Sequence, residues 1–109
     1  MARRMISNAE VLDDMLKDPE FREEWERTAL ARAVAEAVIR YRAERGLSQT
    51  ALARLLGWRQ SVVARLETAE HNPSMDTLVE LSRKLGLRVH VDVTPQTGVV
   101  VKVTKSRAA

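Results

Sequence analysis

The sequence predicts a mainly α-helical bundle that ends in a β-hairpin. Apolar residues recur at helical spacing between residues 21 and 85, glycines fall where helices have to end, and valines alternate with polar residues after Gly86. The chain has 109 residues, of which 45% are hydrophobic. It can therefore bury a helical core, but it is small enough for dimerisation to add useful stability.

The first element expected is a long helix that begins after Asp18 and runs without a break to Glu44. Asp18 is a favourable N-cap residue, and Pro19 suits the first helical position. An apolar stripe that starts at Phe21 persists along the whole stretch. Residues 1–12 lack this periodicity and are expected to be flexible.

Two short helices are predicted to meet at Gly57. The first should open after Ser48, whose hydroxyl can cap it, and the second should begin near Arg59 or Gln60. Gly57 lies where the chain must reverse, a position that often requires a positive φ. The apolar residues that lock the two helices together are Leu52, Ala53, Leu56, Val63 and Leu66. This arrangement is a helix-turn-helix.

The polar face of the second short helix indicates binding to DNA. Gln60, Ser61, Val62, Ala64 and Arg65 point away from the apolar seam. Gln and Arg are the side chains that pair with adenine and guanine edges in the major groove. The alternative is a solvated helix face in an ordinary bundle. Trp58, just after the turn, is expected to pack on the core, with its rim near the sugar-phosphate backbone as a second possibility.

The C-terminal part should contain one more helix and a hairpin. Ser74 can cap a helix from Met75 to Leu85 that ends at Gly86. Strands are then expected at 87–93 and 99–103. Because an isolated hairpin is barely stable, we expect the first strand to pair with its counterpart in a second subunit. The valines on its buried face are Val89, Val91 and Val93.

Composition excludes several classes of function. The chain has no cysteine, which rules out disulfides, thiolate metal sites and cysteine nucleophiles and suits a reducing cytoplasm. No signal peptide or membrane span is apparent. A nucleophile elbow, a glycine-rich phosphate loop and an HExxH pair are all missing, so no enzyme is expected. His71 and His90 lack neighbours that would ligate a metal, and no cofactor is expected.

Charge divides the chain into an acidic leader and a basic remainder. Residues 1–27 carry five Lys/Arg against eight Asp/Glu, a net −3, whereas residues 28–109 carry thirteen against seven, a net +6. We interpret residues 1–27 as a leader, 28–86 as the DNA-binding domain and 87–109 as a strand or hairpin with a basic tail. Phe21 and Trp25 in the leader either pack on the chain's own bundle or a symmetry mate, or dock a separate protein.

A set of residues between Ala35 and Leu87 follows one recognisable spacing. Its members are Arg42, Gly46, Leu47, Ser48, Gln49, Leu52, Ala53, Gly57, Val63, Leu66, Glu67, Asn72, Pro73, Leu78, Leu81, Leu85 and Gly86. With this set the chain resembles the Cro/C1-type (XRE) helix-turn-helix repressors of phages and bacteria. The resemblance implies a lambda-repressor-like bundle and a DNA-binding function.

The resemblance also implies a role for individual side chains. DNA bases would be contacted by Arg59, Gln60, Ser61, Val62 and Arg65. DNA phosphates would be contacted by Gln49, Thr50, His71 and Asn72. Arg42 and Glu67 would form the structural ion pair of the family. As a two-fold dimer, the protein would bind an imperfect palindrome with half-sites about 34 Å apart.

A narrower resemblance comes from the run DPEFREEWERTALARAVAEAVIRYRAERGLSQ, supported by LRVHVDV. With this leader and a strand after Gly86, the chain is similar to HigA-type antitoxins. That similarity implies repression of its own operon as a homodimer and neutralisation of a RelE/HigB-like ribonuclease toxin, with Phe21 and Trp25 in contact with the toxin. The alternative is a stand-alone Cro/C1-type repressor without a toxin partner. A small basic reading frame next to the gene would favour the antitoxin.

Overall fold

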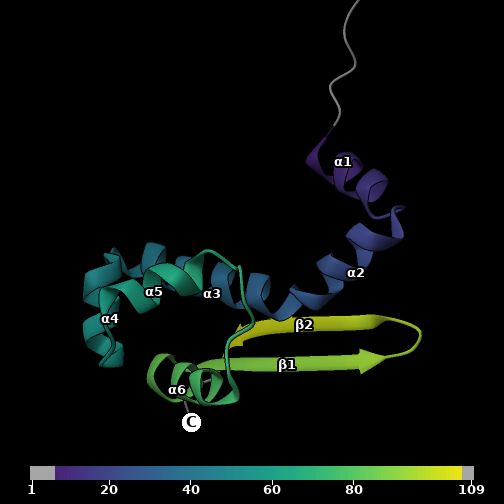
Figure 1. The fold of residues 1–109 in the computed structure, drawn as a ribbon. Coiled ribbons are helices and arrows are strands. Elements are labelled where there is room, and N and C mark those ends of the chain that lie inside the picture. Colours follow the sequence, from purple (N-terminus) through teal and green to yellow (C-terminus); the bar gives the residue numbers. More distant parts are fainter. Residues whose placement is uncertain (1–6, 107–109) are drawn as a thin grey trace, which may run out of the picture.

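The computed structural model describes residues 7–106, which form a mainly helical molecule with one two-stranded sheet (Figure 1). The elements are α1 (Asn8–Met15), α2 (Pro19–Arg27), α3 (Ala29–Arg45), α4 (Gln49–Leu56), α5 (Gln60–Glu67), α6 (Met75–Leu85), β1 (Leu87–Thr94) and β2 (Gly98–Lys105). Helices α4 and α5 gather at one end, the hairpin runs along α3 towards α2, and α1 projects away from the body (Figure 1). No helix within residues 7–106 is long and apolar enough to cross a membrane.

Three helices begin at the caps that the sequence predicts. Asp18, Ser48 and Ser74 lie in extended backbone immediately before α2, α4 and α6. Each side chain accepts a hydrogen bond from a backbone N–H of the first turn: Glu20 at 3.0 Å, Ala51 at 3.0 Å and Thr77 at 3.1 Å. These local bonds satisfy donors that a helix start leaves unpaired, so the three boundaries follow from short-range chemistry.

The corner between α4 and α5 depends on a left-handed residue. Gly57 has φ +70° and ends α4, as the sequence predicts, because a side chain in this conformation costs about 1–2 kcal/mol. Ala69 has φ +58° just after α5 without being glycine. The segment that follows α5 therefore carries backbone strain that the well-packed helices on either side must offset.

The expectation of one unbroken helix running to Glu44 is wrong. Helix α2 ends at Arg27 and α3 begins at Ala29, with Thr28 between them at φ −100° and ψ 13°. The Thr28 hydroxyl donates to the carbonyl oxygen of Glu24 at 3.1 Å, and back-bonding of this kind bends helices. The apolar stripe continues across the break, which explains why periodicity alone predicted a single helix.

A second correction concerns the N-terminus. Residues 1–12 were expected to be flexible, but α1 begins at Asn8; residues 1–6 lie outside the described part of the chain. The Ser7 hydroxyl caps α1 by accepting from the Glu10 N–H at 3.2 Å. The Ser-x-x-Glu spacing of Ser7 and Glu10 is a helix-start signal that sequence analysis missed. Helix α1 buries none of its residues, so it adds little to the core.

The core lies between α3, α4, α5 and α6. Its most deeply buried large side chains are Leu52, Leu56, Leu81, Val34, Val38 and Val63. Trp58 packs against this cluster, as predicted, and Leu87 at the start of β1 is only 5% exposed. The hairpin is therefore fixed to the helical bundle at its first residue.

The two strands form a regular antiparallel hairpin. Leu87 pairs with Lys105 and Thr94 with Gly98 at the two ends of the register. The half near the bundle, including Val89 and Val103, packs on the core. The distal half of the same face does not, because Val91 is 48% and Val93 is 68% exposed. The hairpin thus gains stability within one chain, and its pairing with a second subunit stays a prediction.

Candidate nucleic-acid interface

Helix α5 is held by its apolar side and presents its polar side to solvent. Val63 is 0% exposed and belongs to the core. Gln60, Ser61, Val62 and Arg65, which the sequence assigns to DNA bases, are all exposed. A helix with one buried stripe and a row of exposed Gln and Arg side chains has the form that fits a major groove. Base contacts by these residues stay a prediction.

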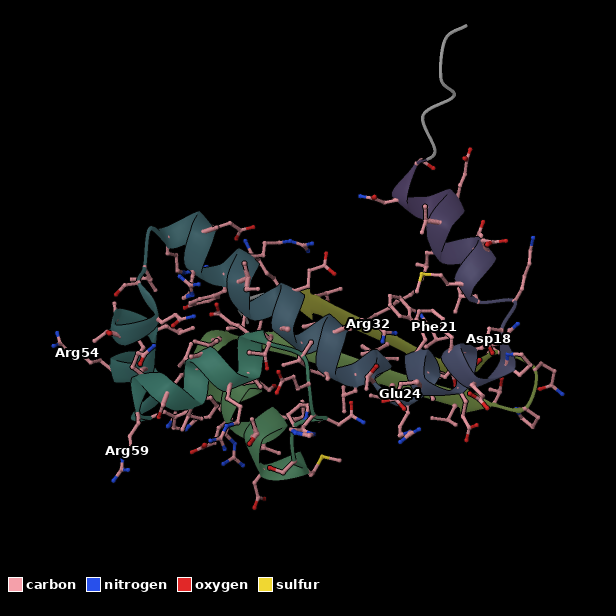
Figure 2. The ribbon with its side chains drawn as sticks, turned by 45° about the horizontal axis from the view of Figure 1, so that its top comes forward. Asp18, Phe21, Glu24, Arg32, Arg54 and Arg59 are labelled. Carbon is pink, nitrogen blue, oxygen red and sulfur yellow. The ribbon has the colours of Figure 1, made fainter. Side chains whose placement is uncertain are left out.

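Arg54 and Arg59 lie at the outer end of the α4–α5 corner. Figure 2 shows both side chains pointing away from the body, at the end opposite Phe21. Arg54, Arg59 and Arg65 have no ion-pair partner anywhere in residues 7–106, so their charges face solvent. Sequence analysis assigned Arg59 to bases and missed Arg54. Since Leu52, Ala53 and Leu56 point inward, helical spacing already places Arg54 on the outer face.

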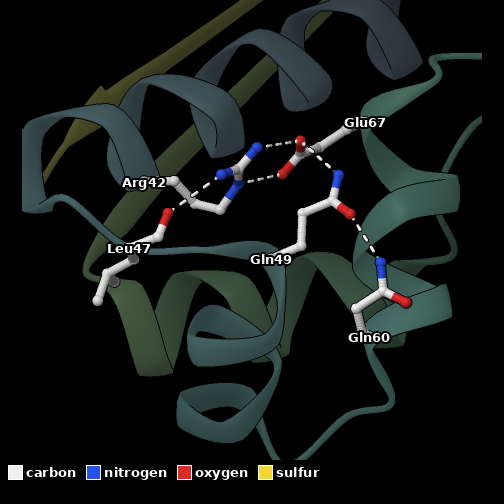
Figure 3. A network of polar contacts seen from close by, with 5 residues as sticks. All are labelled: Arg42, Leu47, Gln49, Gln60 and Glu67. Atoms are coloured by element: carbon white, nitrogen blue, oxygen red, sulfur yellow. Dashed lines mark hydrogen bonds and ion pairs between the residues drawn. The ribbon is translucent and has the colours of Figure 1, made fainter.

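An ion pair behind α5 connects it to α3. Arg42 donates from Nε and Nη2 to the two carboxylate oxygens of Glu67, both at 2.6 Å (Figure 3). Arg42 Nη1 also donates to the carbonyl oxygen of Leu47 at 3.1 Å, which ties in the α3–α4 connection. The Glu67 side chain is 8% exposed. The hydrogen bonds from Arg42 lower the pKa of Glu67 against the opposing effect of burial.

Gln49 extends the Arg42–Glu67 hydrogen-bond network to Gln60 on the exposed face of α5. Its Nε2 donates to Glu67 at 3.1 Å, and its Oε1 accepts from Nε2 of Gln60 at 2.7 Å (Figure 3). Gln60 thereby keeps its carbonyl oxygen and one N–H for another partner. Those two groups are the pair that an adenine edge requires. The network therefore holds Gln60 in one orientation without any ligand, and the phosphate contact of Gln49 stays a prediction.

Helix α6 braces the corner from the other side. Nε1 of Trp58 donates to Glu80 at 2.8 Å, and Nζ of Lys84 donates to the carbonyl oxygen of Leu56, at the end of α4. A lysine at this place satisfies a helix-end carbonyl and complements the negative end of the helix dipole. Helix α5 is thus held from α3 at its last residue, Glu67, and from α6 near its start.

The remaining predicted phosphate contacts differ in their surroundings. Thr50 and His71 are exposed and available to a ligand. Asn72, although exposed, uses its amide inside the chain: Nδ2 donates to the carbonyl oxygen of Arg27 at 2.7 Å, and Oδ1 accepts from the Ala31 N–H at 3.0 Å. A phosphate contact by Asn72 stays a prediction, and the structure gives this residue an internal role that sequence analysis did not foresee.

The aromatic pair of the leader lies on α2. Phe21 and Trp25 are half-buried and stack with their ring centroids 6.0 Å apart. The guanidinium of Arg32 lies 3.4 Å above the Trp25 ring, and Arg32 Nη1 donates to the Thr28 hydroxyl at 2.6 Å. A hollow between α1 and α2 is lined by Asp13, Leu16, Lys17, Arg22, Trp25 and Glu26. The pair is therefore partly covered by its own chain and partly open.

The fold and the exposed face of α5 define a class of protein, the DNA-binding helix-turn-helix proteins. Comparison with protein families agrees, because residues 38–91 match a helix-turn-helix family model. The match supports a Cro/C1-type (XRE) helix-turn-helix domain in this segment and a sequence-specific DNA-binding regulator, a class that is not typically catalytic. No curated protein and no solved structure matches the chain significantly. Within residues 7–106, no cluster of three or more His, Asp or Glu side chains is placed to hold a metal ion.

Replacing Glu67 with Gln should destabilise the fold in a pH-dependent way. At neutral pH we expect a loss of about 3 kcal/mol in the free energy of unfolding, because the guanidinium of Arg42 is left without its counter-charge. The pKa of Glu67 is lowered in the folded state from the ordinary 4.5, so the wild-type contribution is complete above that value and is lost as the pH falls below it. The difference between the two chains should therefore shrink in acid.

Urea unfolding at a series of pH values measures this difference. Glu23→Gln, on the exposed face of α2, is the matched control and should leave the stability close to the wild-type value. An equal loss for Glu67→Gln at every pH would mean that the carboxylate charge is not what matters.

Proposed function

We propose that the protein is an antitoxin that binds operator DNA as a homodimer, represses its own operon and neutralises a RelE/HigB-like ribonuclease toxin. The DNA-binding part rests on one observation: Gln60, Ser61 and Arg65 form an exposed row on a helix whose other side is buried, and Gln60 is held in place by Gln49. In this proposal residues 1–27 bind the toxin, 28–86 bind DNA and 87–109 form the dimer. The protein acts in the cytoplasm, without a cofactor.

The toxin part rests on the chemistry of the leader. Residues 8–27 contain eight acidic and three basic residues. The half-buried, stacked rings of Phe21 and Trp25 belong to the same segment. A ribonuclease that binds the RNA backbone carries a basic surface. An acidic helix with an aromatic anchor has the charge and the apolar contact to cover such a surface.

The dimer part rests on the apolar end of the hairpin. Val91 and Val93 are exposed on the same face of β1, and Val91 lines a groove with Met75 and Val79 of α6. Within residues 7–106 the outer edge of β1 has no strand partner. A second copy that pairs along this edge would extend the sheet and cover the valines.

Replacing Gln60 or Arg65 with Ala should weaken specific DNA binding by about 1–3 kcal/mol and relax the preference at one base position of each half-site. The preference is read from duplexes that the wild-type chain selects out of a random library, and the affinities are then measured at fixed salt. Arg40→Ala removes an exposed arginine of α3 and should keep the base preference. If both α5 variants selected the same duplex sequences as the wild type, α5 would not be the helix that contacts the bases.

Replacing both Phe21 and Trp25 with Ser should abolish binding of the toxin and spare binding of the selected duplex, because α2 and α5 lie towards opposite ends of the molecule (Figure 1). The measurement is co-purification with the product of the neighbouring small reading frame. Val100→Ser, which removes a 40% exposed valine from the hairpin, should still co-purify. Retention of the toxin by the double variant would place its binding site elsewhere, and absence of any toxin gene would favour a stand-alone repressor.

Replacing Val91 and Val93 with Lys should yield monomers in sedimentation, since two ammonium groups cannot be buried at a two-fold interface without partners. The control carries two lysines on the opposite face of the same hairpin, at His90 and Val100, and should remain dimeric. A dimer that persists in the Val91/Val93 variant would exclude this face as the interface.

A further inference from the structure

The junction between α2 and α3 is closed by a side chain from a distant part of the chain. Two helices that meet at Thr28 leave carbonyl groups at the end of α2 and N–H groups at the start of α3 to be satisfied. Thr28 satisfies only the carbonyl groups of α2. Its hydroxyl donates to carbonyl oxygens of α2 and accepts from Arg32, so it does not bond to the N–H groups of α3. It provides no side-chain cap for α3.

Asn72 supplies the missing cap. Its Oδ1 accepts from the N–H of Ala31, in the first turn of α3, at 3.0 Å, and its Nδ2 donates to the carbonyl oxygen of Arg27, at the end of α2, at 2.7 Å. One carboxamide thus bonds to both helices from more than forty residues away in the chain. Because α2 buries none of its own residues, its direction depends strongly on a few such contacts.

The segment that carries Asn72 also borders the DNA-facing helix. Residues 68–74 connect α5 to α6 and contain the strained Ala69. His71, Asn72 and Pro73 line a shallow groove together with Arg65 of α5. A phosphate that binds beside His71 or Arg65 would therefore act on the same short loop that holds the α2–α3 junction.

We propose that Asn72 is a positioning residue that couples the orientation of α2 to the occupancy of the DNA face. When a ligand shifts the 68–74 loop, the bonds to Arg27 and Ala31 transmit the shift to α2, and a ligand on α2 acts on the loop through the same bonds. By thermodynamic linkage the effect on affinity is equal in both directions. The inference rests on the proposed placement of this loop against DNA, but it does not require the toxin.

Amide hydrogen exchange with and without the selected duplex tests the coupling in the full-length chain. In the wild type, binding of the duplex should change the protection of α2 amides and of Ala31 by about fivefold or more. In Asn72→Ala, compared at a duplex concentration that saturates the variant, the response of α2 should vanish. Asn72→Asp keeps the acceptor for Ala31 and loses the donor to Arg27, so it should lose most of the response. Glu70→Ala, an exposed change in the same loop, should retain it.

Protection of the buried α6 amides of Leu78 and Leu81 reports in the same spectra whether each variant is folded. The coupling is overturned if the wild type binds the duplex without any change in the protection of α2, or if Asn72→Ala shows the full change. Either outcome leaves the proposed DNA binding intact. A wild-type chain that selects no duplex overturns both.

Discussion

The ion pair between Arg42 and Glu67 is the contact on which the position of α5 most depends. It joins α3 to the last residue of α5, and through Leu47 and Gln49 it also reaches the α3–α4 connection and the first residue of α4. Taking two charges largely out of water is costly, and such a pair adds little net stability over apolar packing. Its bidentate geometry is strongly directional, however. We therefore interpret the pair as fixing one orientation of α5.

The same orientation is enforced from α6 by a different kind of contact. Lys84 holds the carbonyl end of α4, and the indole of Trp58 packs on the core while donating to Glu80. Both contacts lie at the start of α5, whereas Glu67 lies at its end. A helix of only eight residues is too short to be stable by itself. Support at both ends is what allows its outer face to consist of polar side chains that make few contacts with the protein.

Local chemistry explains which parts of this fold the sequence predicts. The caps at Asp18, Ser48 and Ser74 act within one turn, and a glycine that ends a helix, such as Gly57, acts at its own position, so each is readable from a few neighbouring letters. The hairpin follows from valines at period two, and the observed strands extend the predicted ones by only one or two residues at their ends.

The features that sequence analysis missed depend on contacts between distant segments or on weak local signals. The break at Thr28 is stabilised by Asn72, and no helical pattern within residues 18–44 contains that information. The orientation of Gln60 by Gln49 likewise requires α4 and α5 to be already packed. The start of α1 is a different case, because the Ser7 cap was present in the sequence but was outweighed by the lack of an apolar stripe.

The separation of the two candidate surfaces limits how a partner on α2 can influence DNA binding. Arg54 and Arg59 point outward at one end of the molecule, and Asp18, Phe21 and Glu24 lie at the other (Figure 2). A protein bound to α2 therefore does not have to cover the start of α5 in the same subunit. In the proposed dimer, any effect on operator binding must pass between the two subunits or through the chain itself. Within the chain, the Asn72 carboxamide is a direct polar link between α2 and the loop that follows α5.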